Sequence, residues 1–164
     1  MVGLKYMDSV YIETSVVSYL QQRTSSHLVT AAHQLLTQKW WDTERFNYDL
    51  VVSQYVIDEI SAGDPDLAAE RIRFLDGIPI LSNAPEIIQI AERILSRAIL
   101  PANAQVDALH IAAVVHHRVN YLLTWNCRHI ANARILPRIH EFLMEAGIPI
   151  PIICTPEELL GDDS

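Results

Sequence analysis

The chain has 164 residues, half of them hydrophobic, and a formal net charge of −8. This length and apolar content predict a folded domain with a sizeable core and exclude a disordered chain. The acidic balance excludes a protein that holds nucleic acid by bulk electrostatic attraction, because such domains carry a basic face. No apolar run is long enough to span a bilayer, so we expect no membrane contact.

The two cysteines, Cys127 and Cys154, show no CxxC spacing. Residues 1–8 lack the apolar stretch that a secretory signal needs. We therefore predict a cytoplasmic protein whose reduced thiols act as small apolar fillers. The five glycines form neither a GxGxxG nor a Walker pattern, so a glycine-rich phosphate loop is not expected.

Strand-like runs alternate with amphipathic stretches from the start of the chain. Residues 9–12 predict a central strand that delivers Glu13 to its C-terminal tip, and residues 16–20 have helical spacing. Residues 25–46 predict a long amphipathic helix with an apolar stripe. We expect the pair Trp40 and Trp41 in this stripe to pack in the core.

The next segments continue the alternation. Residues 48–52 predict a second strand, and Ser53 is a good N-cap for a helix that reaches Ala62. Asp64 and a following proline predict a further helix over 64–75. Residues 78–81 predict a third strand at the sheet edge, because its proline cannot donate to a ladder.

The remaining predicted elements are helices over 83–98, about 102–117 and 138–146, strands over 121–124 and 148–154, and a capping box over 155–158. Helices separate nearly every pair of strands. This predicts an α/β fold, a three-layer α/β/α sandwich with a mostly parallel sheet of about five strands. We expect one domain over residues 1–160 and a loose tail over 161–164.

Polar residues gather where such strands end and helices begin. Glu13 follows the first strand, Glu59 lies on the helix after the second, and Asp107 lies in the first turn of the helix before the fourth. Together with Asn126, just past the fourth strand, they predict an oxygen-rich pocket at one rim of the sheet. Such a pocket suits Mg²⁺ or Mn²⁺. A cation there activates water and offsets phosphate charge, so an acidic chain is compatible with a nucleic-acid substrate.

Each acid also has an ordinary explanation when it is taken alone. Most helix carboxylates such as Glu59 are solvated, and the helix dipole favours an acid at a first-turn position such as Asp107. Glu13 is harder to explain this way, because it directly follows a central apolar strand. A transition-metal site at Asp107 and His110, three residues apart on one helical face, is a second interpretation.

The segments that carry these residues resemble the PIN-domain family, and in particular the VapC-type toxins of prokaryotic toxin–antitoxin pairs. The similar segments are residues 10–16, 53–63, 107–112 and 122–129, in the same order over about residues 9 to 132. The resemblance implies a PIN-like fold, a metal-dependent endoribonuclease with Mg²⁺ or Mn²⁺ as cofactor, RNA as substrate, a cognate antitoxin as partner, and a homodimer.

The resemblance also implies residue roles. The implied catalytic residues are Glu13, Glu59, Asp107 and Asn126, and the first three of these are the implied metal ligands. Glu13 stands where the family usually has an aspartate, so it is one methylene longer. Asn126 is neutral where the family has a fourth acid. Both departures change how the cation is held.

Further residues are implied to support the acids or to bind RNA. The hydroxyls of Ser15 and Thr124 match groups that support the acidic cluster, and His129 covers the region of the fourth acid. The arginines expected to contact the RNA backbone as bidentate phosphate donors are Arg128, Arg134 and Arg138.

Two other functions are compatible with the sequence. One is a non-catalytic PIN-like module with a weakened metal site, in which the helix over residues 25–46 contacts a partner and the pair Trp40 and Trp41 serves as an anchor. The other is a small-molecule phosphohydrolase built on the same sheet.

Overall fold

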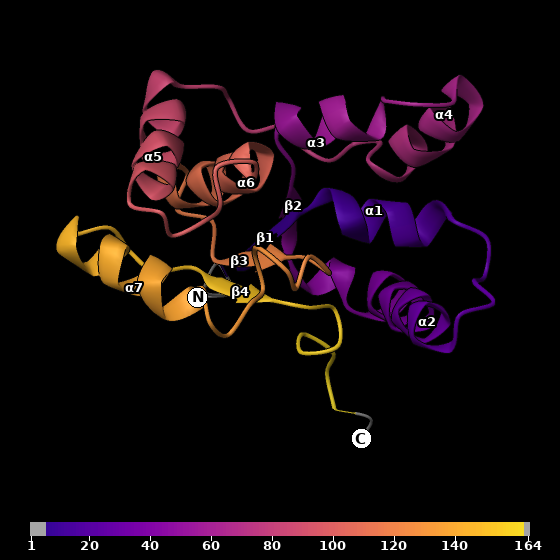
Figure 1. The fold of residues 1–164 in the computed structure, drawn as a ribbon. Helices are drawn as coiled ribbons and strands as arrows, with labels where there is room; N and C mark the ends of the chain where they lie inside the picture. Colours follow the sequence, from indigo (N-terminus) through magenta and orange to yellow (C-terminus); the bar gives the residue numbers. More distant parts are fainter. Residues whose placement is uncertain (1–5, 163–164) are drawn as a thin grey trace.

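The structure, a computed structural model, describes residues 6–162. Within this range its centre is a four-stranded sheet with the order β2-β1-β3-β4, in which every neighbouring pair is parallel (Figure 1). The strands are β1 (Ser9–Ile12), β2 (Asp49–Val51), β3 (Tyr121–Leu123) and β4 (Ile152–Cys154). The predicted α/β class with a parallel sheet is confirmed.

The prediction of a third strand over 78–81 is wrong, because this segment forms no full strand. Val52 and Ile80 form only an isolated parallel bridge. It is closed by hydrogen bonds from Val52 N to Pro79 O and from Leu81 N to Val52 O. Because Pro79 has no N–H, the segment cannot extend the ladder. The sheet of the described residues therefore has four strands rather than about five.

Helices connect all consecutive strands, as parallel pairing requires. In residues 6–162 they are α1 (Thr14–Gln21), α2 (Leu28–Thr43), the 3-10 helix η1 (Arg45–Asn47), α3 (Gln54–Ile60), α4 (Pro65–Phe74), α5 (Pro85–Ser96), α6 (Gln105–His116) and α7 (Leu136–Glu145). Figure 1 shows α5 and α6 on one side of the sheet and α2 on the other.

Side-chain alternation along the strands explains the layers. The hydroxyl of Tyr11 on β1 reaches His110, so α6 covers the face to which Tyr11 points. Tyr121 pairs with the residue before Tyr11 and therefore points to the other face. There its ring contacts Tyr48, which stacks on Trp40 of α2. Helices thus cover both faces, as the predicted three-layer sandwich requires.

The apolar stripe of α2 is only partly buried. Trp40 and Trp41 are buried, as predicted for core residues. Leu28 and Leu35 of the same stripe are 85% and 73% exposed, so the N-terminal part of the stripe does not face the core. The N-terminal half of α2 extends beyond the sheet, where α1 is its neighbour (Figure 1).

The predicted capping residues make the expected hydrogen bonds, with one exception. Asp64 caps α4 by accepting two backbone N–H groups, and Thr155 with Glu158 forms the expected capping box over a short turn. Ser53 occupies the N-cap position of α3 but makes no capping hydrogen bond. Its hydroxyl lies 2.6 Å from the hydroxyl of Tyr11 instead.

Neither cysteine forms a disulfide. Cys154 is buried, and this burial together with the charge of Glu158 raises the pKa of its thiol to about 12. Cys127 is exposed in the irregular segment after β3, so its predicted role as an apolar filler is wrong. Residues 161–162 are exposed and lie outside helices and strands, and the rest of the predicted tail lies outside the described residues. No helix within residues 6–162 has the length and apolarity to cross a membrane.

Candidate metal centre

The site lies at the C-terminal ends of the two central strands. The chain passes from β1 to β2 on one side of the sheet and from β3 to β4 on the other, so the strand order reverses between β1 and β3. Ligands of open parallel sheets bind at such a switch point. Glu13 directly follows β1 and Thr124 directly follows β3. The Thr124 hydroxyl donates to Oε2 of Glu13 at 2.7 Å.

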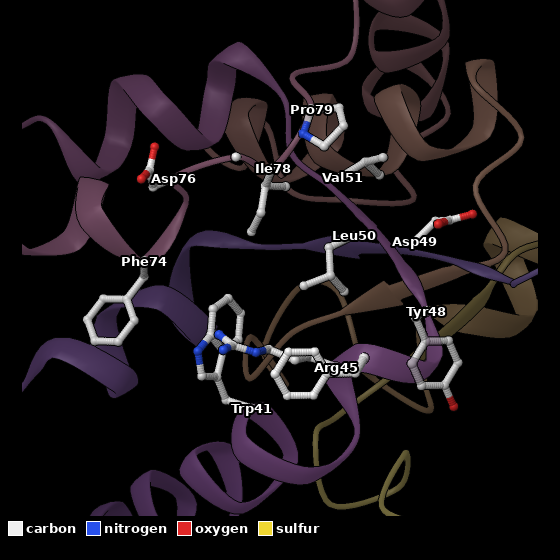
Figure 2. Close-up of a pocket in the computed structure, with 12 residues that line it drawn as sticks. Trp41, Arg45, Tyr48, Asp49, Leu50, Val51, Phe74, Asp76, Ile78 and Pro79 are labelled. Carbon is white, nitrogen blue, oxygen red and sulfur yellow. The ribbon is translucent and has the colours of Figure 1, made fainter.

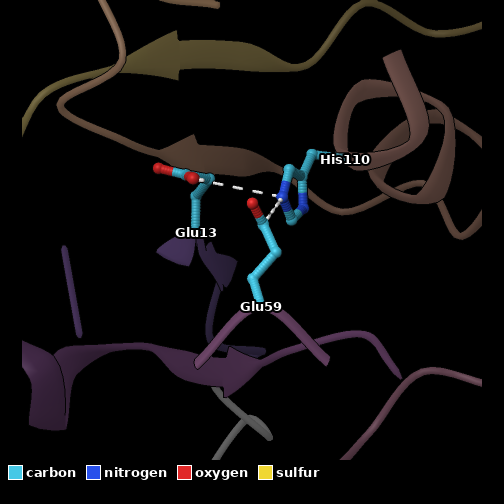
Figure 3. A group of neighbouring side chains, drawn as sticks. All are labelled: Glu13, Glu59 and His110. Atoms are coloured by element: carbon cyan, nitrogen blue, oxygen red, sulfur yellow. Dashed lines mark hydrogen bonds and ion pairs between the residues drawn. The ribbon is translucent and has the colours of Figure 1, made fainter. Parts of the chain in front are cut away.

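Glu13 is a buried carboxylate with one fixed oxygen. It is 5% exposed and stands at the N-cap of α1. Its Oε2 accepts from the Ser15 backbone N–H at 3.1 Å and from the hydroxyls of Ser15 and Thr124. In residues 6–162 its Oε1 accepts no hydrogen bond and lies 4.0 Å from Nε2 of His110 (Figure 3). That oxygen is available to a ligand.

Glu59 and His110 approach Glu13 from two helices (Figure 3). Oε1 of Glu59, on α3, accepts from Nε2 of His110 and from the Thr14 hydroxyl, both at 2.6 Å. Burial raises the pKa of Glu59, but the hydrogen bonds from His110 and Thr14 and the His110 charge outweigh it, so the pKa lies below its ordinary value. The ligand atoms of Glu13, Glu59 and His110 all lie within 4.8 Å of one another.

The ring of His110 is fixed at its second nitrogen. His110 is fully buried, and its Nδ1 lies 2.6 Å from the Tyr11 hydroxyl, which in turn contacts Ser53. Burial raises the pKa of Tyr11 far above its ordinary value, so the phenol stays protonated. The imidazole is therefore oriented by a neutral hydroxyl from β1 that the N-cap residue of α3 holds in place.

A second polar group lies beside the first. Asp107 accepts from the Asn126 side-chain amide at 3.0 Å and lies 2.8 Å from Nδ1 of His129. The side-chain oxygen of Asn126 accepts the His129 backbone N–H at 3.0 Å. The Asn126 backbone N–H donates to Thr124 at 2.9 Å. Because Thr124 also donates to Glu13, one hydrogen-bond network joins the two groups.

The predicted site residues fall into these two groups. Glu13 and Glu59 come together with His110, and Asp107 comes together with Asn126 and His129. Asp107 is not among the residues whose ligand atoms cluster within 4.8 Å, so its role as a metal ligand stays a prediction. Ser15 and Thr124 contact Glu13 as described above, and their supporting role likewise stays a prediction.

The arginines expected to bind RNA are exposed. Arg128 lies in the segment that also carries Asn126, whereas Arg134 precedes α7 and Arg138 lies on it. Arg138 donates to the backbone oxygen of Arg97. No described hydrogen bond or ion pair in residues 6–162 joins the three predicted arginines to the acidic groups, and their role remains a prediction.

The sequence placed His110 in the second interpretation, a transition-metal site with Asp107, and not in the oxygen-rich pocket, and it gave Tyr11 no role in either. The spacing of His110 from Asp107 indicated a shared helical face, which was a usable signal. Tyr11 looked like an ordinary strand residue, because its contact with His110 spans 99 positions of the chain. Periodicity carries no information on such a long-range pair.

A separate pocket of about 540 Å³ lies along the outer edge of β2 (Figure 2). Its lining includes Leu50 and Ile78, and the Arg45 guanidinium lies 4.6 Å from the ring centres of both Trp41 and Phe46. None of the predicted site residues lines it. Figure 2 shows its two lining carboxylates, Asp49 and Asp76, on opposite sides of the pocket, so they do not form a common ligand group.

The residues at the strand ends fit a divalent cation. Two carboxylates and an imidazole from three different elements present donors to one small volume. Carboxylates are the preferred ligands of Mg²⁺ and Mn²⁺, and imidazole is a common ligand of transition metals. In residues 6–162 the described contacts of both glutamates with a basic side chain involve His110 and neither a lysine nor an arginine, so no permanent positive charge of the described residues pairs with these carboxylates.

Comparisons with known proteins support the fold. No family model and no curated protein matches the sequence. A chain in the crystal structure of VapBC2 from Rickettsia felis, bound to a DNA fragment from their promoter, superimposes with a TM-score of 0.55 at 11% identity. The match covers 90% of this chain and 98% of that chain. The likeness shows a common architecture, in agreement with the PIN-like α/β fold.

Proposed function

We propose that the chain is a divalent-metal-dependent endoribonuclease and the toxin of a toxin–antitoxin pair, acting in the cytoplasm. The observation that carries the proposal is the convergence of Glu13, Glu59 and His110 at the switch point of the sheet. The fold shared with a chain of VapBC2 adds weight to it. RNA is the proposed substrate, and Mg²⁺ or Mn²⁺ is the proposed cofactor.

Glu13 and Glu59 are the proposed carboxylate ligands. Ser15 and Thr124 hold one oxygen of Glu13 in place, and Thr14 does so for Glu59. These hydrogen bonds orient the carboxylates before a cation arrives, which reduces the cost of binding. A bound divalent cation supplies a water of lowered pKa and offsets the charge that builds on the phosphate.

Asp107 and Asn126 complete the proposed catalytic set. Asp107 lies one helical turn before His110, and its carboxylate orients both the Asn126 amide and the His129 ring. Asp107 therefore has two proposed roles. It is either a third metal ligand or the residue that positions Asn126 and His129. Of the three arginines proposed to contact the RNA backbone, Arg128 is the closest to Asn126 in the sequence, and its side chain is exposed.

We also propose that a small antitoxin protein binds the groove between α1 and α2, and that the chain forms a homodimer. The groove has a volume of about 520 Å³ and is lined by Leu20 of α1 and by Leu28, Ala31 and Leu35 of α2. The two leucines of α2 are exposed apolar side chains on one helical face, which is typical of a partner-binding surface. Trp40 and Trp41 are buried and cannot serve as the anchor.

Cleavage of a mixed RNA pool in the presence of Mn²⁺ tests the enzymatic proposal. Glu59→Gln removes a proposed ligand and should lower the cleavage rate about 100-fold or more, since even outer-shell changes cost 10- to 100-fold. Asp107→Asn should also reduce it strongly. Asp58→Asn, which removes an exposed charge from the neighbouring position of α3, is the matched control and should cleave like the wild type.

Equal cleavage by Glu59→Gln, Asp107→Asn and the wild type at equal folding would contradict the proposal. Metal binding without RNA cleavage, combined with hydrolysis of a simple phosphomonoester, would favour a phosphohydrolase. Failure to bind Mg²⁺ or Mn²⁺ would favour the non-catalytic binding module.

A further inference from the structure

We propose that His110 is a nitrogen ligand of the metal centre and makes the site select a first-row transition-metal ion such as Mn²⁺ over Mg²⁺, with Tyr11 as the positioning residue. The inference rests on the metal site of the proposed function but not on RNA as its substrate. It assigns to the site a donor that the acidic residues alone do not provide.

Donor atoms of Glu13, Glu59 and His110 are arranged around one small volume. Nε2 of His110 faces Oε1 of Glu59 at 2.6 Å and Oε1 of Glu13 at 4.0 Å. Both glutamates therefore direct an oxygen toward the same ring nitrogen. If His110 served only as a hydrogen-bond donor to a carboxylate, one glutamate facing Nε2 would be enough. The second carboxylate, which is buried and has no hydrogen bond on Oε1 in residues 6–162, indicates a place for a cation.

The other ring nitrogen of His110 has the kind of partner that a metal-ligating histidine needs. A metal-ligating histidine donates its second N–H to a fixed acceptor, which sets its tautomer. Tyr11 is placed for this role, because its hydroxyl oxygen lies 2.6 Å from Nδ1 and its proton can be donated to Ser53 at 2.6 Å. With Nδ1 protonated, Nε2 carries the lone pair that binds a metal. In the other tautomer of His110, Nε2 carries the proton and donates it to Glu59, and Nδ1 accepts a hydrogen bond from the Tyr11 hydroxyl. The Tyr11 hydroxyl then accepts from Ser53, so the two tautomers differ in the direction of the Tyr11–Ser53 hydrogen bond.

The chemistry of these donors distinguishes between the candidate cations. An all-oxygen site suits Mg²⁺, which keeps most of its waters and binds imidazole poorly. One buried imidazole with two carboxylates instead favours transition-metal ions. His110 cannot turn away to leave an all-oxygen site, because it is fully buried and contacts Glu59 and Tyr11 at its two nitrogens.

The test uses the whole chain loaded with Mn²⁺ and two readouts that do not depend on activity. Competition calorimetry should show Mn²⁺ binding at least 10-fold more tightly than Mg²⁺. Electron spin-echo envelope modulation of bound Mn²⁺ should show a directly coordinated ¹⁴N, and histidine labelled with ¹⁵N should change that modulation in the unmutated chain. The labelling arm needs no variant and so does not depend on how a variant folds.

Variants assign the nitrogen to a residue. His110→Gln should abolish the nitrogen modulation and reduce the Mn²⁺ to Mg²⁺ affinity ratio about 10-fold. Tyr11→Phe should keep the modulation and weaken Mn²⁺ binding by 10- to 100-fold, as expected of an outer partner. His116→Gln is the matched control, because it removes another histidine of α6 that is not in the ligand group, and it should keep both the modulation and the affinity ratio.

Bound Mn²⁺ without nitrogen modulation, or modulation that persists in His110→Gln, would overturn the inference even if RNA is cleaved. Nitrogen modulation without RNA cleavage would support the inference and contradict the nuclease proposal. A chain that binds no Mn²⁺ would overturn both.

Discussion

At the scale of single residues, Glu59 links the chemistry of the site to the stability of the fold. Its side chain is 37% exposed, yet the hydrogen bonds from His110 and Thr14 outweigh burial and lower its pKa. A carboxyl group whose pKa is lower in the folded chain stabilises the fold above its unfolded pKa. This contribution is lost as the pH falls through the folded value.

The expected consequence is a pH-dependent difference between wild type and Glu59→Gln. With a chelator present, wild type should be the more stable at neutral pH, and the difference should shrink as the pH falls below the ordinary glutamate value of 4.5. Urea unfolding at a series of pH values measures it. Asp58→Asn controls for the loss of one charge from α3, and a difference for Glu59→Gln that grows on acidification would contradict the account.

At the scale of elements, helix α2 holds the segment that follows β3. The indole Nε1 of Trp125 donates to the Thr37 hydroxyl at 2.6 Å, and its ring stacks on His33 at 4.0 Å between centres. Both contacts come from α2. Since Asn126 is the next residue, the position of the second polar group depends on a helix that carries none of the predicted site residues.

Thr37→Val should therefore destabilise the fold by about 1–3 kcal/mol, because it leaves the buried Trp125 N–H without an acceptor. The shape of the side chain is nearly unchanged. Thr43→Val on the same helix removes an exposed hydroxyl that donates to the Lys39 backbone, and it should change stability by no more than about 0.5 kcal/mol. Equal effects of the two changes in urea unfolding would show that the Trp125 bond contributes little.

At the scale of the whole molecule, the groove that contains the exposed leucines of α2 is lined by none of the three residues of the metal centre. We predict that the double change Leu28→Asp and Leu35→Asp abolishes binding to the proposed antitoxin and leaves the fold intact. Calorimetry measures the binding. Ile88→Asp, an exposed apolar residue on α5, is the matched control. Loss of binding in the control alone would place the partner elsewhere.

The sequence predicted what depends on local pattern. Strands β1 and β3, the amphipathic helices and the cap at Asp64 follow from alternation, helical spacing and capping chemistry. The gathering of Glu13 and Glu59 followed from the rule that parallel strands end at a common rim. These features need no knowledge of distant contacts.

The features that the sequence did not predict depend on tertiary contacts. The segment at 78–81 has strand character, but it meets β2 at a single bridge. Ser53 has the chemistry of a cap, yet its hydroxyl bonds Tyr11. The sequence grouped His110 with Asp107, whereas α3 brings Glu59 to it from 51 positions away. In each case a partner far along the chain decides the outcome.

A crystal structure of the chain soaked in Mn²⁺ locates the bound ion by its anomalous signal. We expect one strong peak within bonding distance of Glu13, Glu59 and Nε2 of His110. A peak bonded to Asp107 and not to His110, or no peak at the C-terminal ends of β1 and β3, would contradict this expectation.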